Sequence, residues 1–196
     1  MNIGLFFGSF NPIHTGHMII AQHLANQAEI EQVWLVVSPH NPLKLKSSLA
    51  KDYDRLHLVN LAIEDNPKIR SCKVEFDLPQ PSYTIDTLTY LKEKYPQHVF
   101  ALIMGSDNLL SLPKWKHHEL ILQNHLIYIY NRPNADKENP LSSHPNVRIC
   151  KAPLIEISST EIRNAIAEGH SIRYLVPDKV FEYLNGSRMY KRRIDE

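Results

Sequence analysis

Cysteine is scarce in this sequence: Cys72 and Cys150 are the only two among 196 residues. Two cysteines cannot make the disulfide framework of a small secreted protein, and neither has the close Cys or His neighbours that a structural zinc site needs. The scarcity favours a reducing compartment, and we therefore expect a cytoplasmic protein.

An excess of charge of either sign is also missing. The 22 lysines and arginines stand against 21 acidic residues, a formal net charge of +1, so no overall field attracts nucleic acid or an acidic membrane surface. The opening residues MNIGLFFGSF have no basic segment, and their apolar run is too short for a signal peptide or a membrane span. We expect no nucleic-acid and no membrane partner, and any anionic ligand must be bound by a local site.

What the chain does have is an alternation of short apolar runs with segments of helical spacing. The expected buried strands are residues 3–7, 32–37, 99–104 and 125–130, and the expected helices are 17–28, 54–65 and 84–95. This alternation is typical of a parallel sheet with helices on both faces. The expected fold is α/β, a Rossmann-like doubly wound parallel sheet with C-terminal helices, in a single domain over residues 1–196.

The last part of the chain has a different character. Residues 131–146 are polar, contain three prolines and are expected to form an exposed loop. Two short helices should follow, in a small helical part at about residues 157–196. Ser158 with Glu161 predicts a capped helix start, and Gly169 predicts its end. The second helix is expected at about residues 178–184, with Gly186 just beyond it.

The turn after the first expected strand reads GSFNPIHTGH, residues 8–17. In an open parallel sheet this turn is a usual phosphate site, because the following helix presents amide groups there. Gly8 is expected to let the backbone leave the strand in a conformation that other residues resist, and Gly16 to let a ligand or a neighbouring strand approach the helix start. The turn matches neither a P-loop nor a three-glycine dinucleotide fingerprint.

His14 and His17 lie three positions apart, about one helical turn, so both imidazoles can face one ligand. Two donors beside an anion suggest stabilisation of phosphate charge that grows during a reaction. From these residues alone, a tight turn with incidental histidines is an equally good interpretation, since the chain has 11 histidines.

A second motif makes the interpretation specific. GSFNPIHTGH together with ISSTEIR (157–163) resembles the nucleotidyltransferase superfamily, which is marked by an HxGH turn after the first strand and a late [ST]xxxxR helix start. Within it, three further blocks resemble the bacterial nicotinate mononucleotide adenylyltransferases: PSYTIDTL (81–88), MGSDNLLSLPKW (104–115) and YLVPDKVFEYL (174–184). The blocks follow the family's order over nearly the whole chain.

The resemblance implies adenylyl transfer from ATP to nicotinate mononucleotide, giving nicotinate adenine dinucleotide and pyrophosphate in NAD biosynthesis. In this family the phosphate of the mononucleotide attacks the α-phosphorus of ATP directly, Mg²⁺ assists, and no enzyme side chain becomes covalently attached. A phosphate dianion is already a nucleophile, so the protein mainly positions substrates and neutralises charge. Mg²⁺ is expected on the ATP phosphates rather than in a metal site of the protein, and a homo-oligomer is left open.

Carried onto this chain, the resemblance places His14, His17 and Arg163 at the reacting phosphates, with Arg163 on the leaving pyrophosphate. The other expected ATP-binding residues are Gly8, Ser9 and Phe10 through their backbone, and Gly16, Gly105, Asp107, Arg132, Ile157, Ser158 and Ser159. Ser158 and Ser159 begin a helix whose amides can bind the β- and γ-phosphates. Asp107 is expected to bind a ribose or to position Mg²⁺ through water. Without the first motif, SSTEIR would be an ordinary capped helix and Asp107 a helix N-cap.

For the other substrate, the expected residues are Lys44, Ser82, Tyr83, Thr84, Trp115 and Lys116. Trp115 would stack on the pyridine ring, while the Thr84 hydroxyl and amide and the Lys116 amide would receive the carboxylate. Such donors favour the acid, because the NH₂ group of nicotinamide mononucleotide would face them donor to donor. Taken alone, Trp115 would be interpreted as a core tryptophan.

Two positions depart from the family's pattern. Asn11 stands where the family usually has Asp, which removes a charge near the phosphates. Leu43 stands where the family's PPHK loop has histidine, so Lys44 is nearly as well explained as a solvated loop lysine. This loop borders the mononucleotide pocket, and its change bears on specificity.

Other functions stay open on the sequence. A sister adenylyltransferase acting on phosphopantetheine shares the two phosphate motifs, but it is usually shorter and lacks PSYT and PKW. An enzyme preferring nicotinamide mononucleotide differs by one group of the substrate. A non-catalytic nucleotide-binding module would need neither His17 nor Arg163, and a fragment of a class I aminoacyl-tRNA synthetase is disfavoured by the absent KMSK-type loop.

Overall fold

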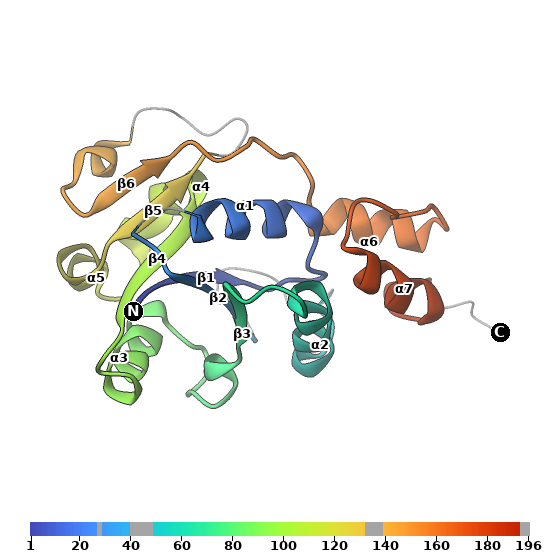
Figure 1. Cartoon of the computed structure of the whole chain (residues 1–196), viewed down its shortest axis with the longest axis horizontal. Coiled ribbons are helices and arrows are strands. Elements are labelled where there is room, and N and C mark those ends of the chain that lie inside the picture. The colour runs from blue at the N-terminus through green and yellow to red at the C-terminus, as the bar shows by residue number, and fades with distance from the viewer. Residues whose placement is uncertain (27–28, 40–48, 132–138, 193–196) are drawn as a thin grey trace.

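The computed structural model describes residues 1–26, 29–39, 49–131 and 139–192. Six strands form one sheet in the order β3-β2-β1-β4-β5-β6, and all neighbours are parallel (Figure 1). The strands are β1 (Asn2–Gly8), β2 (Gln32–Val37), β3 (Ile69–Cys72), β4 (Val99–Gly105), β5 (Ile127–Tyr130) and β6 (Val147–Cys150). This is the strand order of doubly wound nucleotide-binding folds, and it confirms the expected α/β architecture.

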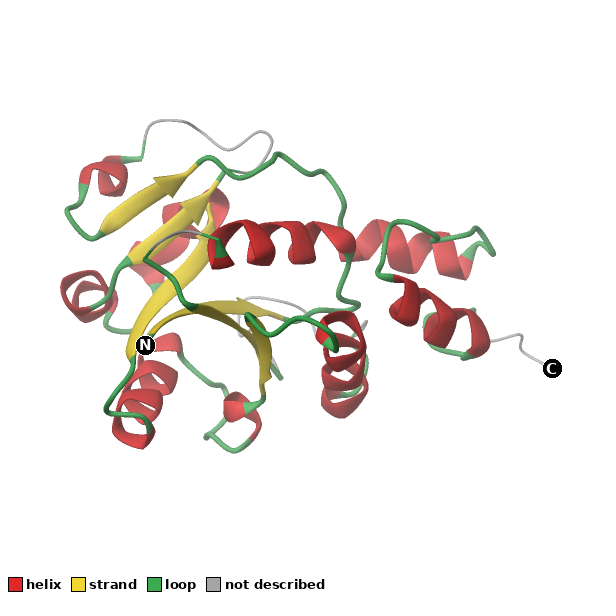
Figure 2. Ribbon diagram, in the orientation of Figure 1, coloured by secondary structure: helices red, strands yellow, loops and turns green. Residues whose placement is uncertain are grey.

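Helices cover both faces of the sheet, as Figure 2 shows. The α-helices are α1 (Thr15–Ala25), α2 (Asp52–Ile63), α3 (Thr84–Lys94), α4 (Ser106–Ser111), α5 (His118–Asn124), α6 (Ser159–Ala167) and α7 (Asp178–Gly186). In the part of the chain that the structure describes, the connections contain the short 3₁₀ helices η2 (Val74–Phe76), η3 (Leu112–Lys114) and η4 (Pro140–Ser143). The helices α6 and α7 lie together at one end of the molecule (Figure 1).

Two separate hydrophobic cores result, one on each face of the sheet. Successive side chains of a strand point to opposite faces, so Leu35 of β2 lies in the core with α1, α2, α6 and α7, whereas Trp34 and Val36 lie in the core with α3, α4 and α5. We call these the α1-side core and the α3-side core. The strands read as continuous apolar runs because both of their faces are buried.

The sequence predicted the four long apolar strands and the helices α1, α2, α3, α6 and α7, within a few residues at their ends. It missed the edge strands β3 and β6 and the short helices α4 and α5. The expected loop at 131–146 contains η4, and 132–138 lie outside the described residues. Gly186 was expected just beyond α7 but is its last residue. Gly169 ends α6 as predicted, with a φ of +75°.

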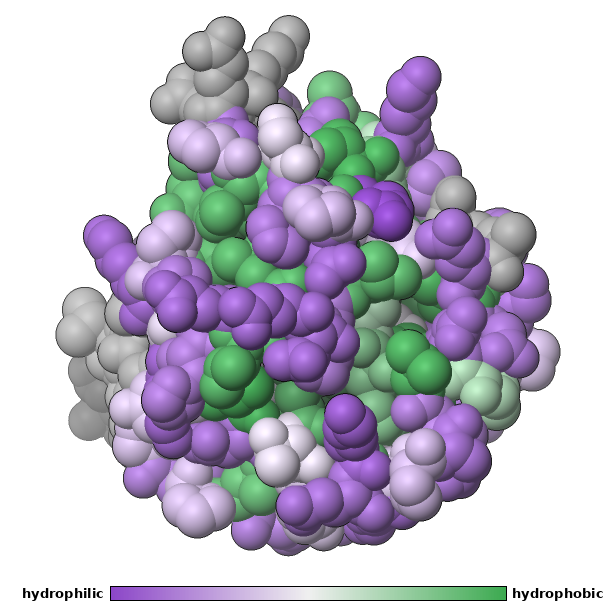
Figure 3. All heavy atoms as spheres, turned by 90° about the vertical axis from the view of Figure 1, so that its left-hand side faces the viewer, coloured by the Kyte–Doolittle hydropathy of each residue, from purple (hydrophilic) through white to green (hydrophobic). Residues whose placement is uncertain are grey.

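The surface carries no broad field of one kind on the face that Figure 3 draws, which is the end opposite α6 and α7. Polar and apolar residues are interspersed there. Within the described part of the chain, none of the helices has the length and apolar character to cross a membrane.

Candidate active site

The candidate site lies where the strand order reverses, between β1 and β4. The chain continues from β1 to β2 on one side, while β4 pairs with β1 on the other. Gly8 ends β1 and Gly105 ends β4, so the carboxyl ends of these two adjacent strands lie side by side and lead to α1 and α4. Ligands of open α/β sheets bind in the crevice outside such a point.

The exit turn after β1 is shaped by a buried aromatic ring rather than by glycine flexibility. Phe10 is only 1% exposed, its φ is +44°, and its ring packs edge-on against Phe6 and His17. A Cβ added to Gly8 would lie 2.9 Å from that ring, while Gly8 itself belongs to the strand. The expectation that Gly8 supplies an unusual backbone conformation is therefore wrong: Phe10 adopts it, and Gly8 makes room for the Phe10 ring.

His14 and His17 are brought together by the helix start that they cap. His14 is the N-cap of α1, and its Nδ1 accepts from the His17 amide at 3.3 Å, while Nδ1 of His17 accepts from the His14 amide at 3.3 Å. The two rings stack with their centroids 3.6 Å apart. Because each Nδ1 is an acceptor, a neutral ring carries its hydrogen on Nε2. In that tautomer the two stacked rings carry adjacent Nε2–H donors.

Gly16 holds open the space beside these rings. A Cβ at this position would lie 3.0 Å from Nδ1 of His14 and 3.3 Å from Cγ2 of Ile155. The close approach that the sequence predicted at Gly16 is thus made by a histidine ring and by the segment that leads into α6. Any larger residue would press on the His14 ring and disturb the stack.

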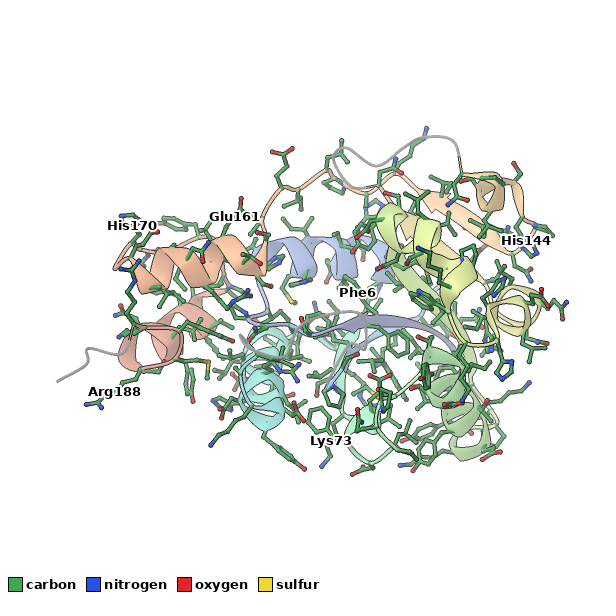
Figure 4. All side chains as sticks on the ribbon, turned by 180° about the vertical axis from the view of Figure 1, so that it is seen from behind. Phe6, Lys73, His144, Glu161, His170 and Arg188 are labelled. Carbon is green, nitrogen blue, oxygen red and sulfur yellow. The ribbon has the colours of Figure 1, made fainter. Side chains whose placement is uncertain are left out.

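The start of α6 packs directly on the exit turn, although the two segments are about 150 residues apart in the chain. Ser158 and Glu161 form the predicted capping box, with the Glu161 amide 3.2 Å from the Ser158 Oγ. The Ser159 hydroxyl donates to the carbonyl of Pro12 at 2.9 Å. In Figure 4, Glu161 marks this end of α6, beside the start of α1, and Phe6 lies beneath α1.

Arg163 lies one turn further along α6 and points to the same place. Its Nη1 donates to the carbonyl of Asn11 at 2.8 Å, and its Nη2 donates to the Thr160 hydroxyl at 3.3 Å. The side chain is half-buried rather than solvated. The two phosphate motifs of the sequence therefore meet at one site, with a guanidinium group held against the turn that carries the histidine pair.

Two further expected ATP residues have clear structural settings. Asp107 is the second residue of α4, and Gly105 is the N-cap, so the alternative that Asp107 caps this helix is wrong. Ile157 packs its side chain against the α1-side core, which leaves its backbone as the part that can contact a ligand. Lys44 and Arg132 lie outside the described residues.

The blocks PSYT and PKW also meet in space. Nζ of Lys116 lies 3.0 and 2.9 Å from the two carboxylate oxygens of Asp86, in the first turn of α3, and 4.9 Å from the centre of the Tyr83 ring. Trp115 ends η3 half-buried, and its Nε1 donates to the Ser111 hydroxyl at 3.3 Å. A fully buried core tryptophan is thus excluded, and the indole lies at the margin of the α3-side core.

Thr84 is the first residue of α3, and its neighbours Ser82 and Tyr83 differ in exposure. Ser82 is buried and Tyr83 is exposed. Since the N-terminal amides of a helix have no partners within it, the amide of Thr84 belongs to a group of donors suited to an anion. This places the expected carboxylate-binding residues at a helix start next to Trp115 and Lys116.

Sequence reasoning missed Arg55, the largest side chain that is completely buried. Its guanidinium group donates to the carbonyls of Ser9, Ser38, Pro39 and Ala50 and to the carboxylate of Asp52. These carbonyls belong to the exits of β1 and β2 and to the start of α2. Arg55 therefore ties the phosphate turn to the neighbouring loop, and its place on an ordinary helical pattern gave no signal of this.

Glu75, in η2, is a second buried group that the sequence did not reveal. It is 3% exposed, and the Thr87 hydroxyl donates to its Oε1 at 2.9 Å. Burial raises the pKa of this carboxyl, and hydrogen bonds from the hydroxyls of Ser38, Thr87 and Ser82 oppose the shift. Glu75 thereby joins the end of β2 to the block that contains Thr84.

Comparisons with known proteins agree with this geometry. The family model described as cytidylyltransferase-like matches residues 5–165. A "Probable nicotinate-nucleotide adenylyltransferase" of Flavobacterium johnsoniae is 55% identical over 98% of this chain and 100% of its own length. A protein of the same name from Bacteroides fragilis is 45% identical over 91% of this chain and 89% of its own.

Solved structures share the fold. The nicotinic acid mononucleotide adenylyltransferase of Plasmodium falciparum, complexed with NaAD, matches with a TM-score of 0.79 and 21% identity, over 96% of this chain and 97% of that one. The same enzyme complexed with APC matches with a TM-score of 0.78 and 21% identity, over 96% of each chain. At 21% identity these matches support the fold alone. Because they cover 96% of this chain, the shared fold includes the C-terminal helices.

Proposed function

The chain belongs to the cytidylyltransferase-like family and, within it, to the nicotinate-nucleotide adenylyltransferases, and we propose on this basis how it carries out their reaction. It transfers the adenylyl group of ATP to nicotinate mononucleotide, giving nicotinate adenine dinucleotide and pyrophosphate. One observation supports our assignment of the reacting centre: Arg163 of α6 donates to the carbonyl of Asn11, in the turn that carries His14 and His17. This contact joins the two phosphate motifs at the switch point of the sheet.

In the reaction, an oxygen of the mononucleotide's phosphate attacks the α-phosphorus of ATP. The bond from that phosphorus to the bridging oxygen breaks, and pyrophosphate leaves with the electron pair. The Nε2–H groups of His14 and His17 donate to phosphate oxygens as negative charge grows on them, which lowers the barrier. Arg163 neutralises the leaving pyrophosphate with its forked guanidinium group. No side chain needs to act as a nucleophile.

The triphosphate is bound mainly by backbone groups. The backbone at the end of β1, at Gly8, and just after it, at Ser9 and Phe10, approaches it from one side. The start of α6 at Ser158 and Ser159 approaches it from the other. Because the capping box uses the amides of Ser158 and Glu161, the amides between them in the first turn are the donors left for the β- and γ-phosphates. Gly105 and Asp107 face the adenosine ribose.

The pyridine end of the acceptor binds between the starts of α3 and α5. Trp115 stacks on the ring, and the amides of Thr84 and Lys116 receive the carboxylate. Since the ammonium group of Lys116 is paired with Asp86, the backbone rather than the side chain of Lys116 recognises the substrate. Neutral amide donors favour nicotinate over nicotinamide mononucleotide.

Mg²⁺ supplies charge neutralisation on the phosphates when it is bound with ATP. The ion would arrive with the triphosphate and keep most of its water. Asp107 is proposed either to accept from a ribose hydroxyl or to position this ion through water. The cytoplasmic location stays a prediction of the sequence.

The test is pyrophosphate release with nicotinate mononucleotide and ATP. His17→Ala and Arg163→Ala should each lower kcat on the order of 100-fold with unchanged unfolding curves, because each loses a contact to charge that develops in the reaction. His170→Ala and Arg188→Ala, both at exposed positions, are the matched controls. Unchanged turnover in the first pair would refute the assignment, and a higher kcat/KM with nicotinamide mononucleotide would refute the acid preference.

A further inference from the structure

Asn11 is the point at which three distant segments meet the phosphate turn. The residue is 3% exposed, and its Oδ1 accepts from the Ala50 amide at 3.1 Å and from the Tyr190 hydroxyl at 2.7 Å. Its backbone carbonyl accepts from Arg163 at 2.8 Å. The side chain of Asn11 is therefore held from one side, while its backbone holds the arginine on the other.

Tyr190 reaches this point from the segment that follows α7. Its φ is +63°, a conformation that costs free energy for a residue with a side chain. The ring is half-buried and packs with Met189 against the α1-side core. A strained backbone that persists needs surrounding contacts to hold it, and the hydrogen bond from this hydroxyl to Oδ1 of Asn11 is such a contact.

The electrostatic setting keeps the Tyr190 hydroxyl a donor. Burial raises the pKa of this phenol well above its usual value, and the positive charges of Arg163 and Arg55 oppose that shift only in part. A protonated phenol is the form that can donate to Oδ1 of Asn11, the contact that the structure shows at 2.7 Å.

We propose that Tyr190 is a positioning residue for adenylyl transfer, acting through Asn11 on Arg163. The tyrosine hydroxyl and the Ala50 amide fix the amide group of Asn11, which fixes the carbonyl that receives Arg163. This carbonyl then sets the direction in which the remaining N–H groups of Arg163 point toward pyrophosphate. The turn that follows α7 therefore supports the reaction site through Asn11. This inference rests on the role proposed above for Arg163.

The test replaces the tyrosine with Tyr190→Phe, which removes one oxygen and keeps the ring. We expect kcat to fall on the order of 10-fold, a change of about 1.4 kcal/mol in the barrier, while KM for nicotinate mononucleotide stays unchanged. That substrate's expected pocket lies at the other core. Tyr183→Phe is the matched control, because Tyr183 is also in the C-terminal part and its ring contacts His57 instead.

The double variant Tyr190→Phe with Arg163→Ala separates positioning from simple loss of stability. If Tyr190 acts through Arg163, its substitution has no further effect on kcat once the guanidinium group is gone. A full additional 10-fold loss in that background would overturn the inference, as would a single variant whose kcat lies within twofold of the wild type.

Binding of pyrophosphate, measured by titration calorimetry, provides a reading that does not depend on turnover. Tyr190→Phe should raise the dissociation constant for pyrophosphate on the order of 10-fold, the factor expected for kcat. Tyr183→Phe should leave this dissociation constant unchanged. A wild-type protein that binds pyrophosphate in this pattern but does not release it from ATP would refute the proposed function, while the positioning of Arg163 by Tyr190 for pyrophosphate binding would still stand. Equal dissociation constants for wild type and Tyr190→Phe would overturn the inference alone.

Discussion

The substitution Arg55→Met, which removes the buried arginine of α2, should lower the free energy of unfolding by about 3 kcal/mol. The side chain is 0% exposed, donates to carbonyls from three segments and pairs with the carboxylate of Asp52. Losing a charged donor costs about 1.5 to 3 kcal/mol per bond, and a carbonyl left without a partner costs about 1 to 3 kcal/mol. Methionine keeps most of the packing volume and removes the cost of burying a charge, which offsets part of the loss.

The free energy of unfolding is measured by urea titration, followed by circular dichroism. For a chain of this length about 3 kcal/mol corresponds to a fall of roughly 6 to 12 °C in Tm. The denaturant slope should stay the same, because the surface exposed on unfolding hardly changes. Arg188→Met, at an exposed position, is the control and should lie within about 0.5 kcal/mol of the wild type.

Arg55→Lys sharpens the test. One ammonium group cannot reach carbonyls on three segments as a planar fork does, so lysine should recover less than half of the lost stability. A loss below about 1 kcal/mol for Arg55→Met would refute the reasoning, because it would mean that the carbonyls of Ser9, Ser38 and Ala50 find other partners without cost. Full recovery by lysine would refute the argument from geometry.

Two further predictions concern the acceptor side of the site. Burial raises the pKa of Glu75, so its contribution to stability is present at low pH and is lost as pH rises through the folded-state pKa. The free energy of unfolding of Glu75→Gln, minus that of the wild type, should therefore become more positive as pH rises. Urea unfolding at several pH values measures this difference, and a difference that does not change with pH would contradict the prediction. Trp115→Ala should raise KM for nicotinate mononucleotide on the order of 10-fold through lost stacking and leave KM for ATP within about twofold, whereas equal rises in both would argue against stacking on the pyridine ring.

The main strands and the capped helices could be predicted because their signals are local. β1, β2 and β4 are buried on both faces and read as unbroken apolar runs, and the capping box of α6 spans only four residues. The edge strands β3 (IRSC) and β6 (VRIC) have four residues each and carry polar or exposed positions. An edge strand needs little apolar character, because only one neighbour defines it.

The candidate site divides in the same way. The histidine pair and the serines at the start of α6 follow from motifs of a few residues, and the structure places them together. Arg55 and Tyr190 could not be found, since their contacts join residues 46 and 179 positions apart. No local pattern encodes such contacts. The role of Gly8 was misjudged for a related reason: the ring that needs its missing Cβ belongs to Phe10, and only the folded turn shows where that ring lies.

The residues proposed for phosphate transfer and those proposed for recognition of the acceptor belong to cores on opposite faces of the sheet. Phe10 and Ile157, which belong to the phosphate motifs, pack into the α1-side core, whereas Ile85 and Trp115, at the proposed pyridine site, pack against the α3-side core. The two sets of residues are connected through β1 and β4, whose ends form the crevice between them. A substitution on the α3 side can thus reshape the acceptor pocket without moving the histidine pair. With the site proposed here, we expect that a change of acceptor requires no change in the exit turn after β1, because that turn would contact the phosphates and not the ring beyond them.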